Sequence, residues 1–311
     1  MRTPRPRTAM ALLGAGLVVM WSSGFIGAEL GTRAAPATTL LVWRFLVVAA
    51  LLGAWLVWRR RRVGVRDLVL HAVIGALAQA GYLYGVVAAA GYGVPAGTSA
   101  LIAALQPVAA TALAAPVLGE RATGRQYAGL ALGVAGVALV VAGDLRAGGA
   151  APGWAYALPL AAMLSLVAAT LLERRTRPGA GIVAALAVQC GVSAVLFTGV
   201  AAVTGTLAPP ADPGFWGAVV WVVVLSTLGG YGLYWAVLAR SGVARVSALL
   251  YLTPPATLLW AAVMFGDAVT VPALVGMGVC AVAVALVHRA PAPAAGRAPQ
   301  RGERRPEPAG R

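Results

Sequence analysis

The sequence contains no lysine, and only 11% of its 311 residues are charged. Soluble domains carry about 25% charged residues, so this composition, with 60% hydrophobic residues, excludes an ordinary soluble protein. Cysteine is also scarce: Cys190 and Cys280 both fall in apolar stretches, without the paired spacing of a disulfide framework. His71 and His288 have no second ligand at a useful spacing, so we predict no metal site and no cofactor.

Long hydrophobic runs are abundant instead. A transmembrane helix needs about 20 mostly apolar residues, and ten such runs follow one another, separated by short segments containing Arg, Pro or Gly. The runs cover residues 9–28, 37–58, 68–90, 97–118, 126–143, 154–172, 181–203, 215–238, 246–266 and 270–288. We therefore predict an all-α polytopic membrane protein with ten transmembrane helices. The first run lacks a cleavage site of small residues, which favours a retained helix over a signal peptide.

The net charge of +15 comes from 24 arginines. If the N-terminus is cytoplasmic and the chain crosses ten times, 21 arginines lie inside, Arg33 and Arg146 lie outside, and Arg44 lies within the membrane. This asymmetry obeys the positive-inside rule and predicts that both termini are cytoplasmic. The charge therefore indicates orientation in a lipid bilayer, not nucleic-acid binding. The Pro- and Arg-rich tail, residues 290–311, cannot bury apolar surface, and we predict that it is disordered.

Two stretches of the chain resemble each other. "SALIAALQPVAATALAAPVLGE" begins at Ser99, and "SALLYLTPPATLLWAAVMFGD" begins at Ser247; each has a proline eight residues after the serine and ends in glycine and an acid. Upstream, "GYLYGVVAAAGYG" (81–93) matches "GYGLYWAVLARSG" (230–242) more weakly. The sequence therefore predicts two five-helix halves, 9–143 and 154–288. Because five is odd, the second half is inverted, an arrangement typical of secondary transporters with a substrate path near the midplane.

The prolines of the repeated stretches interrupt their spans near the middle. Pro107 follows Gln106, and Pro254 and Pro255 follow Thr253. Proline frees a backbone carbonyl, and irregular backbone at this depth is tolerated only against protein or a wet cavity. One interpretation is a plain packing kink. Because the prolines recur at matching positions, we favour a break that borders a polar path.

Together with these repeats, "WSSGFIGAELGTRAAPATTLLVWRF" and "LQPVAATALAAPVLGE" resemble the EamA domain of the drug/metabolite transporter superfamily. The resemblance covers nearly the whole chain, twice, as in ten-helix members. It implies export of small metabolites, amino acids or related compounds, across the bacterial inner membrane, with proton antiport and alternating access. It also implies a cavity lined by the first four helices of each half. Two positions depart from the family pattern: Glu29 replaces a frequent Lys, and Asp267 replaces a Glu.

Charged residues inside a span are costly and mark functional sites. We predict that Arg44 faces the cavity and binds a substrate carboxylate, with Glu29 as its partner or as a coupling acid. The alternatives are a packing ion pair between the two, or side chains that snorkel to the surface. Glu120 and Asp267 end their helices at the membrane faces, where they act as loop determinants or as gating residues.

Polar and aromatic side chains within the spans form a second group. They are candidates for cavity lining, or else for interhelical hydrogen bonds and aromatic belts. The binding or gating candidates of this group and of the helix breaks are Trp21, Ser22, Ser23, Gln79, Tyr82, Gln106, Pro107, Tyr231, Tyr234, Tyr251, Thr253, Pro254 and Pro255; Tyr84, Ser165, Gln189 and Trp235 are further members.

Glycine-rich faces around Gly133 and Gly276 allow close helix packing, either within the chain or in a homodimer. No catalytic motif and no phosphate-binding loop is present, so the sequence favours a secondary exporter over an intramembrane enzyme or a non-transporting scaffold.

Overall fold

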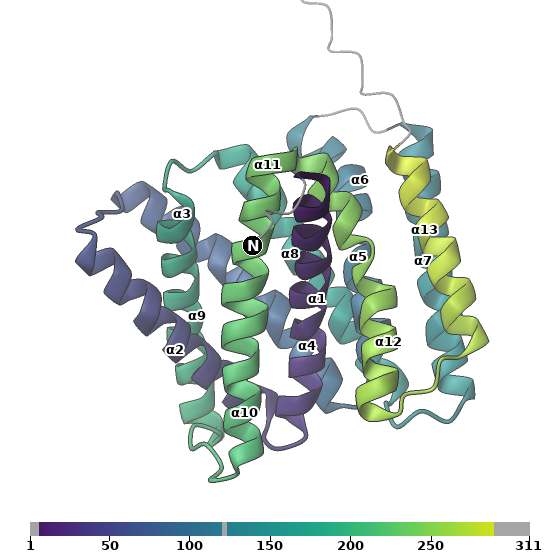
Figure 1. Ribbon diagram of the computed structural model, residues 1–311, viewed down its shortest axis with the longest axis horizontal. Coiled ribbons are helices and arrows are strands. Elements are labelled where there is room, and N and C mark those ends of the chain that lie inside the picture. Colours follow the sequence, from purple (N-terminus) through teal and green to yellow (C-terminus); the bar gives the residue numbers. More distant parts are fainter. Residues whose placement is uncertain (1–5, 120–122, 289–311) are drawn as a thin grey trace, which may run out of the picture.

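The computed structural model describes residues 6–119 and 123–288, which form a bundle of long helices (Figure 1). The predicted tail at 290–311 and the predicted loop residue Glu120 lie outside this described part. The elements are α1 (Pro6–Thr32), α2 (Ala37–Trp58), α3 (Val65–Gly75), η1 (Ala76–Gly81), α4 (Tyr82–Gly91), α5 (Ala96–Ala104), α6 (Gln106–Leu118), α7 (Gly124–Arg146), η2 (Gly153–Tyr156), α8 (Ala157–Thr176), α9 (Ile182–Thr204), α10 (Pro213–Trp221), η3 (Val222–Gly229), α11 (Gly230–Leu250), α12 (Thr253–Phe265) and α13 (Val271–His288).

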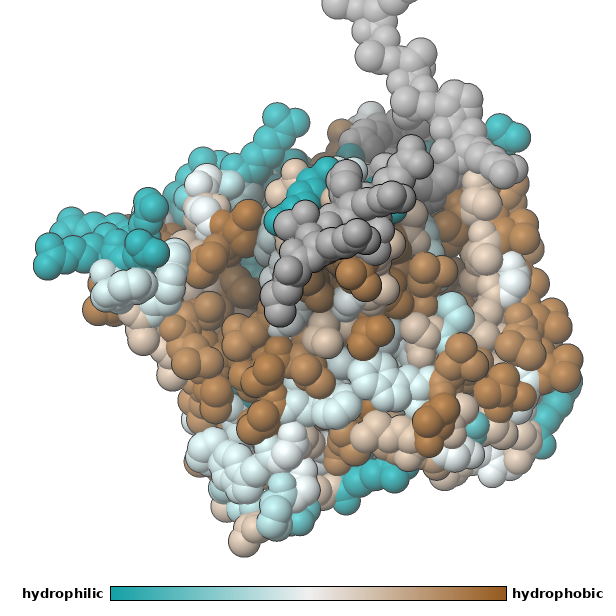
Figure 2. Space-filling view, in the orientation of Figure 1, coloured by the Kyte–Doolittle hydropathy of each residue, from teal (hydrophilic) through white to brown (hydrophobic). Residues whose placement is uncertain are grey.

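In the described part, nine continuous or interrupted helices are at least 18 residues long and apolar enough to cross a membrane. A shorter apolar helix, Val271–Val287, follows as the tenth at the predicted position. Hydrophobic side chains cover the flank of the bundle, and hydrophilic side chains gather at its upper and lower ends (Figure 2). The prediction of an all-α polytopic membrane protein is therefore confirmed.

Local sequence explains where several helices begin and end. The Asp212 carboxylate accepts hydrogen bonds from the backbone N–H groups of Gly214 and Phe215, which caps the start of α10. Thr123 and Gln126 form a capping box at the start of α7. Gly266, with a φ of 78°, ends α12 in the left-handed conformation that glycine adopts without strain.

Four of the spans are interrupted. The third and eighth each contain a π-helical segment, η1 and η3, directly before Tyr82 and before Gly230. The fourth breaks at Leu105, between α5 and α6, and the ninth breaks between α11 and α12. The predicted eighth and ninth spans share the continuous element α11, in which Gly242 (φ 77°, ψ 174°) is the non-helical residue that separates them.

Spans at matching positions of the two predicted halves pack against each other. α7 packs on α13 and α2 on α9, while α5 packs on α12. α1 contacts η3 and α11, and α8 makes the corresponding contacts with η1 and α4. α1 begins and α13 ends at the same, upper end of the bundle (Figure 1).

The glycine-rich faces are used within the chain. A Cβ atom on Gly136 would lie 2.8 Å from the Cys280 Sγ and 3.0 Å from the Gly276 carbonyl oxygen, so α7 and α13 approach to backbone contact. Close approach of this kind is what small residues permit between membrane helices. These faces therefore hold α7 and α13 together, and the possible homodimer stays a prediction.

Candidate functional site

A cavity of about 300 Å³ lies between the two helix breaks. Gln106 and Pro107 line it from the break in the fourth span, and Tyr251 and Thr253 line it from the break in the ninth. We call this space the central cavity. Seven predicted site residues line it: Trp21, Tyr82, Gln106, Pro107, Tyr234, Tyr251 and Thr253.

The prolines and a set of alanines explain why this space exists. Proline has no N–H group and cannot continue the helical ladder, so α6 and α12 each restart beside a proline. The wall formed by α5 and α6 consists largely of Ala100, Ala103, Ala104 and Ala110, whose methyl groups leave room. The Gln106 Nε2 atom donates a hydrogen bond of 3.2 Å to the Thr170 Oγ1 atom on α8.

Ser22 connects α1 to the second break. Its hydroxyl donates a hydrogen bond of 3.4 Å to the carbonyl oxygen of Thr253. Ser23 is also fully buried and donates to the Met20 carbonyl oxygen at 2.6 Å. Neither serine is among the described residues that line the central cavity, and neither are Pro254 and Pro255. These four predicted residues therefore shape the wall without facing the space.

A smaller chamber of about 50 Å³ adjoins the central cavity, with which it shares Trp21, Phe25 and Tyr82 as walls. Arg44, Gln79 and Tyr231 also line it, and we call it the arginine chamber. The Gln79 Nε2 atom donates to the Tyr231 hydroxyl at 2.7 Å, and the Tyr231 ring meets Trp21 edge-on at 5.8 Å between centroids.

Arg44 is buried, with 4% of its surface exposed. Its Nη2 atom donates to the Thr227 hydroxyl at 3.1 Å, and its Nε–H group has no hydrogen-bond partner. Among the described residues that line the two cavities, Arg44 alone carries a formal charge. A buried guanidinium without an anion is costly, so this site is suited to an anionic ligand.

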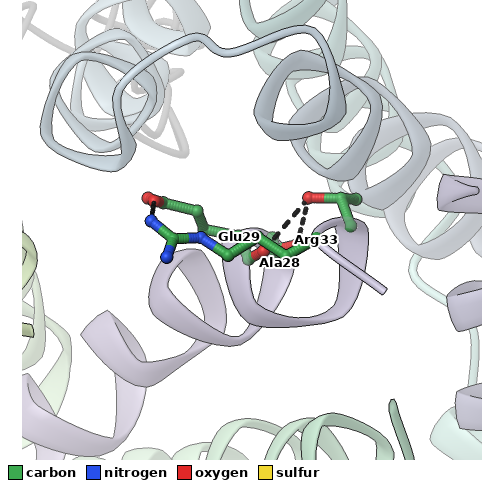
Figure 3. A network of polar contacts seen from close by, with 4 residues as sticks. Ala28, Glu29 and Arg33 are labelled. Atoms are coloured by element: carbon green, nitrogen blue, oxygen red, sulfur yellow. Dashed lines mark hydrogen bonds and ion pairs between the residues drawn. The ribbon is translucent and has the colours of Figure 1, made fainter. Parts of the chain in front are cut away.

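Glu29 does not pair with Arg44, so the predicted partnership between them is wrong. Glu29 binds Arg33 one turn further along α1 at 2.7 Å, as the close-up shows (Figure 3). The alternative that Arg44 snorkels to the surface is also wrong, because its side chain is buried and held by Thr227 on η3.

Glu29, Arg33 and Asp267 line a separate space of about 270 Å³. We call it the outer vestibule, because the predicted topology places this end of the bundle outside. The Arg33 guanidinium lies 4.3 Å from the centre of the Phe265 ring, which joins α1 to α12 by a cation–π contact. Burial raises the pKa of the Asp267 carboxyl above its ordinary value, and the positive charge of Arg33 opposes that rise. An apolar cluster containing Phe25, which lines the central cavity, packs against Phe265, the ring that Arg33 contacts.

Some polar residues of the spans serve packing instead. Ser165 donates to the Leu77 carbonyl oxygen at 2.8 Å, and Gln189 contacts the His71 Nδ1 atom at 3.3 Å. Tyr84 is 43% exposed on the flank, and Trp235 stacks edge-on against Tyr234. In the described ranges, no three His, Cys, Asp or Glu side chains come together.

Sequence reasoning missed Thr170, Thr227 and Phe25. Each is a single small polar or aromatic residue in an apolar helix, and nothing in the local pattern distinguishes it from its neighbours. Thr227 lies three residues before the repeated Gly230 segment, which is the one signal that could have pointed to it.

Comparison with known proteins agrees with this architecture. The chain matches the EamA-like transporter family twice, over residues 8–142 and 153–289. A "Probable terminal-alkyne amino-acid exporter" of Streptantibioticus cattleyicolor is 31% identical over 88% of this chain and 91% of its own length. A "Probable amino-acid metabolite efflux pump" of Salmonella typhimurium is 28% identical over 84% of this chain and 88% of its own.

A solved structure titled "Crystal structure of protein" has the same fold, with a TM-score of 0.58 and 24% identity over 90% of this chain and 96% of its own. An all-helical membrane bundle that encloses an internal cavity between its helices is an architecture that membrane transporters use. The chain belongs to the EamA-like transporter family. It is therefore a multi-pass membrane transporter of small molecules and not an enzyme.

Proposed function

We propose that this chain exports small carboxylate-bearing metabolites, amino acids or related compounds, across the bacterial inner membrane. The observation that carries the proposal is the buried Arg44, which has no anionic partner among the described residues and lines a chamber that shares three wall residues with the central cavity. The names of the relatives as amino-acid exporters support the direction of transport and the substrate class.

Transport by this proposal follows alternating access, with the inverted halves 9–143 and 154–288 moving against each other. Three observations support it. Three pairs of matching spans pack on each other, and the first and sixth spans make reciprocal contacts with the eighth and third, a pattern that agrees with a two-fold relation between the halves. α1 begins and α13 ends at the same end of the bundle (Figure 1), as an even number of crossings requires. The two spaces also lie toward opposite predicted sides of the membrane. Val246 and Ser247 line the central cavity and follow Arg245, which is predicted to be cytoplasmic. The vestibule is lined by Arg33, which is predicted to lie outside.

The orientation has its own test. Reporter domains fused at the two chain ends should both report the cytoplasm, and a reporter inserted between Gly205 and Asp212 should report the outside. Opposite locations for the two ends would reject the inverted duplication.

We also propose that inward proton movement drives export, with Glu29 in the outer vestibule as the coupling acid. Glu29 lies where protons from outside reach it, beside Arg33 and Asp267. In proteoliposomes, an imposed pH gradient should then drive substrate accumulation in wild type, and Glu29→Gln should lose the gradient-driven part while keeping exchange. Gradient-driven accumulation by Glu29→Gln would reject this role.

A non-transporting scaffold predicts an interior closed by large apolar side chains. The central cavity and the arginine chamber argue against that alternative.

The experiment that tests the main proposal measures metabolites accumulating outside cells that overproduce the protein. Wild type should enrich one or more small carboxylates, and Arg44→Ala should abolish that enrichment at equal protein abundance in the membrane. Full export by Arg44→Ala would reject the role of Arg44. No enrichment by wild type would reject the exporter.

A further inference from the structure

The central cavity is neutral and largely apolar. Its walls include the four alanines of α5 and α6, Leu166 from α8, and Leu250 from α11. The polar groups that line it, such as Gln106, Thr170 and Ser247, are uncharged. No described acid or base lines this cavity, whereas the adjoining arginine chamber is lined by the charged Arg44.

The arginine chamber offers an incomplete set of hydrogen bonds. A guanidinium has five N–H donors in a planar fork and can bind a carboxylate through two parallel bonds. The Nη2 atom of Arg44 already donates to Thr227, while the Nε–H group is buried and unpartnered. The chamber, at about 50 Å³, has room for little more than a carboxylate group.

The two spaces share Trp21, Phe25 and Tyr82 as lining residues. A molecule that occupied both would pass between these three side chains. An α-ammonium group, one carbon from a carboxylate on Arg44, would lie near the rings of Trp21 and Tyr231, whose faces attract cations. The rest of the molecule would then extend into the central cavity. A volume of about 300 Å³ is at the small end of ligand pockets, so a single side chain fits there.

From this arrangement we infer that the transported molecule is an amino acid or related carboxylate with an uncharged, mainly apolar side chain, its carboxylate on Arg44 and its side chain between the two helix breaks. The inference rests on the proposed export function and narrows its substrate class. A lysine-like side chain would bury an ammonium group with no acid beside it, and a glutamate-like side chain would bury a second carboxylate with no base beside it. Both are unfavourable against largely apolar walls.

The purified protein in proteoliposomes provides the test, with radiolabelled leucine, phenylalanine, glutamate and lysine as probes. We expect initial uptake of leucine or phenylalanine at least tenfold above that of glutamate and of lysine, and loss of this uptake in Arg44→Ala. Lysine or glutamate uptake as fast as the uptake of leucine and phenylalanine would overturn the inference while leaving the exporter proposal intact. Uptake of none of the four above protein-free liposomes would overturn both.

A change of charge inside the cavity provides a second test. Gln106→Glu keeps the shape of the side chain and adds a carboxylate to the cavity wall, so it should raise the ratio of lysine to leucine uptake at least tenfold. Gln189→Glu is the matched control. It makes the same substitution at a residue that contacts His71 and lines neither cavity. An unchanged ratio in a folded Gln106→Glu protein, or an equal rise in Gln189→Glu, would overturn the placement of the side chain.

Discussion

Arg44 on α2 and Thr227 on η3 meet at 3.1 Å between Nη2 and Oγ1, inside the membrane-spanning part of the bundle. The Thr227 hydroxyl donates its own hydrogen to the carbonyl oxygen of Val222 at 2.9 Å, five residues earlier in the π-helical segment. The hydroxyl oxygen is therefore free to accept from the guanidinium. The backbone of η3 thus fixes the orientation of Arg44, the one charged group among the described residues that line the two cavities.

Replacing Thr227 by valine should weaken the site, because it removes the acceptor and leaves a second buried N–H group of Arg44 unpaired. The loss of a hydrogen bond to a charged group is worth about 1.5–3 kcal/mol. We expect export to fall about tenfold or more, measured as the initial rate in proteoliposomes at matched protein amounts. Thr227→Ser keeps the hydroxyl and should retain most of the rate. Equal rates for the valine and serine variants would contradict an orienting role.

A second prediction concerns the hydrogen bond between Gln79 and Tyr231, which should stabilise the site. Tyr231→Phe keeps the ring against Trp21 but leaves the buried Gln79 amide without its acceptor, at a cost of about 1–3 kcal/mol. The thermal midpoint of the purified protein and its apparent substrate affinity should both fall. Tyr84→Phe is the control, since Tyr84 is exposed on the flank and should behave as wild type. Similar losses in both variants would assign the effect to general packing.

A third prediction concerns the close contact between α7 and α13, which should not tolerate a larger side chain. A Cβ atom at Gly276 would lie 2.7 Å from the Gly136 carbonyl oxygen and would also collide with the Val140 side chain, so Gly276→Ala forces the helices apart. Overpacking of this kind costs about 1–3 kcal/mol, and the thermal midpoint should drop accordingly. Gly278→Ala on the same helix meets nothing within 4 Å and should be neutral. A stable Gly276→Ala protein would show that this contact is loose.

Asp267 makes a prediction about pH. Its carboxyl lies near Arg33, Glu29 and Asp144, and burial raises its pKa above the ordinary value of 3.8. A raised pKa means that the folded protein holds the proton more tightly than the unfolded chain, so stability falls as pH rises from about 4 through the raised pKa. The thermal midpoint of wild type relative to Asp267→Asn should therefore decline across that window. Because Asp267 is partly exposed, the decline should be about 2 °C or less. A difference that rises with pH would contradict the direction of the shift.

The sequence predicted the spans to within a few residues, because span length and apolar content are local properties set by the bilayer. It also predicted both proline breaks, and the structure places Gln106, Pro107, Tyr251 and Thr253 around one cavity. The partners of Arg44 could not be predicted, since Thr227 is 183 positions away and its contact depends on how η3 packs against α2. The inverted relation of the halves and the roles of the site residues stay predictions.

The partner of Glu29 was missed for a more local reason. Arg33 follows Glu29 by four residues, a spacing that places the two side chains on one face of a helix. The predicted first span ended at residue 28, whereas α1 continues to Thr32. Because the predicted span ended before Glu29, the i, i+4 pair of Glu29 and Arg33 was not recognised, and Arg44 was predicted as the partner of Glu29 instead.

The π-helical segments η1 and η3 contain no proline. Their backbone hydrogen bonds join residues five apart, whereas those of an α-helix join residues four apart. An α-helix advances about 100° per residue, because it has 3.6 residues per turn. If such a segment tightened to α-helical bonding, the part of the helix beyond it would swivel by about that angle while keeping its backbone bonded. Tyr82 directly follows η1, and Tyr231 lies two residues beyond η3. Such a change would turn the rings of Tyr82 and Tyr231 relative to the arginine chamber that both line, without unfolding a helical turn.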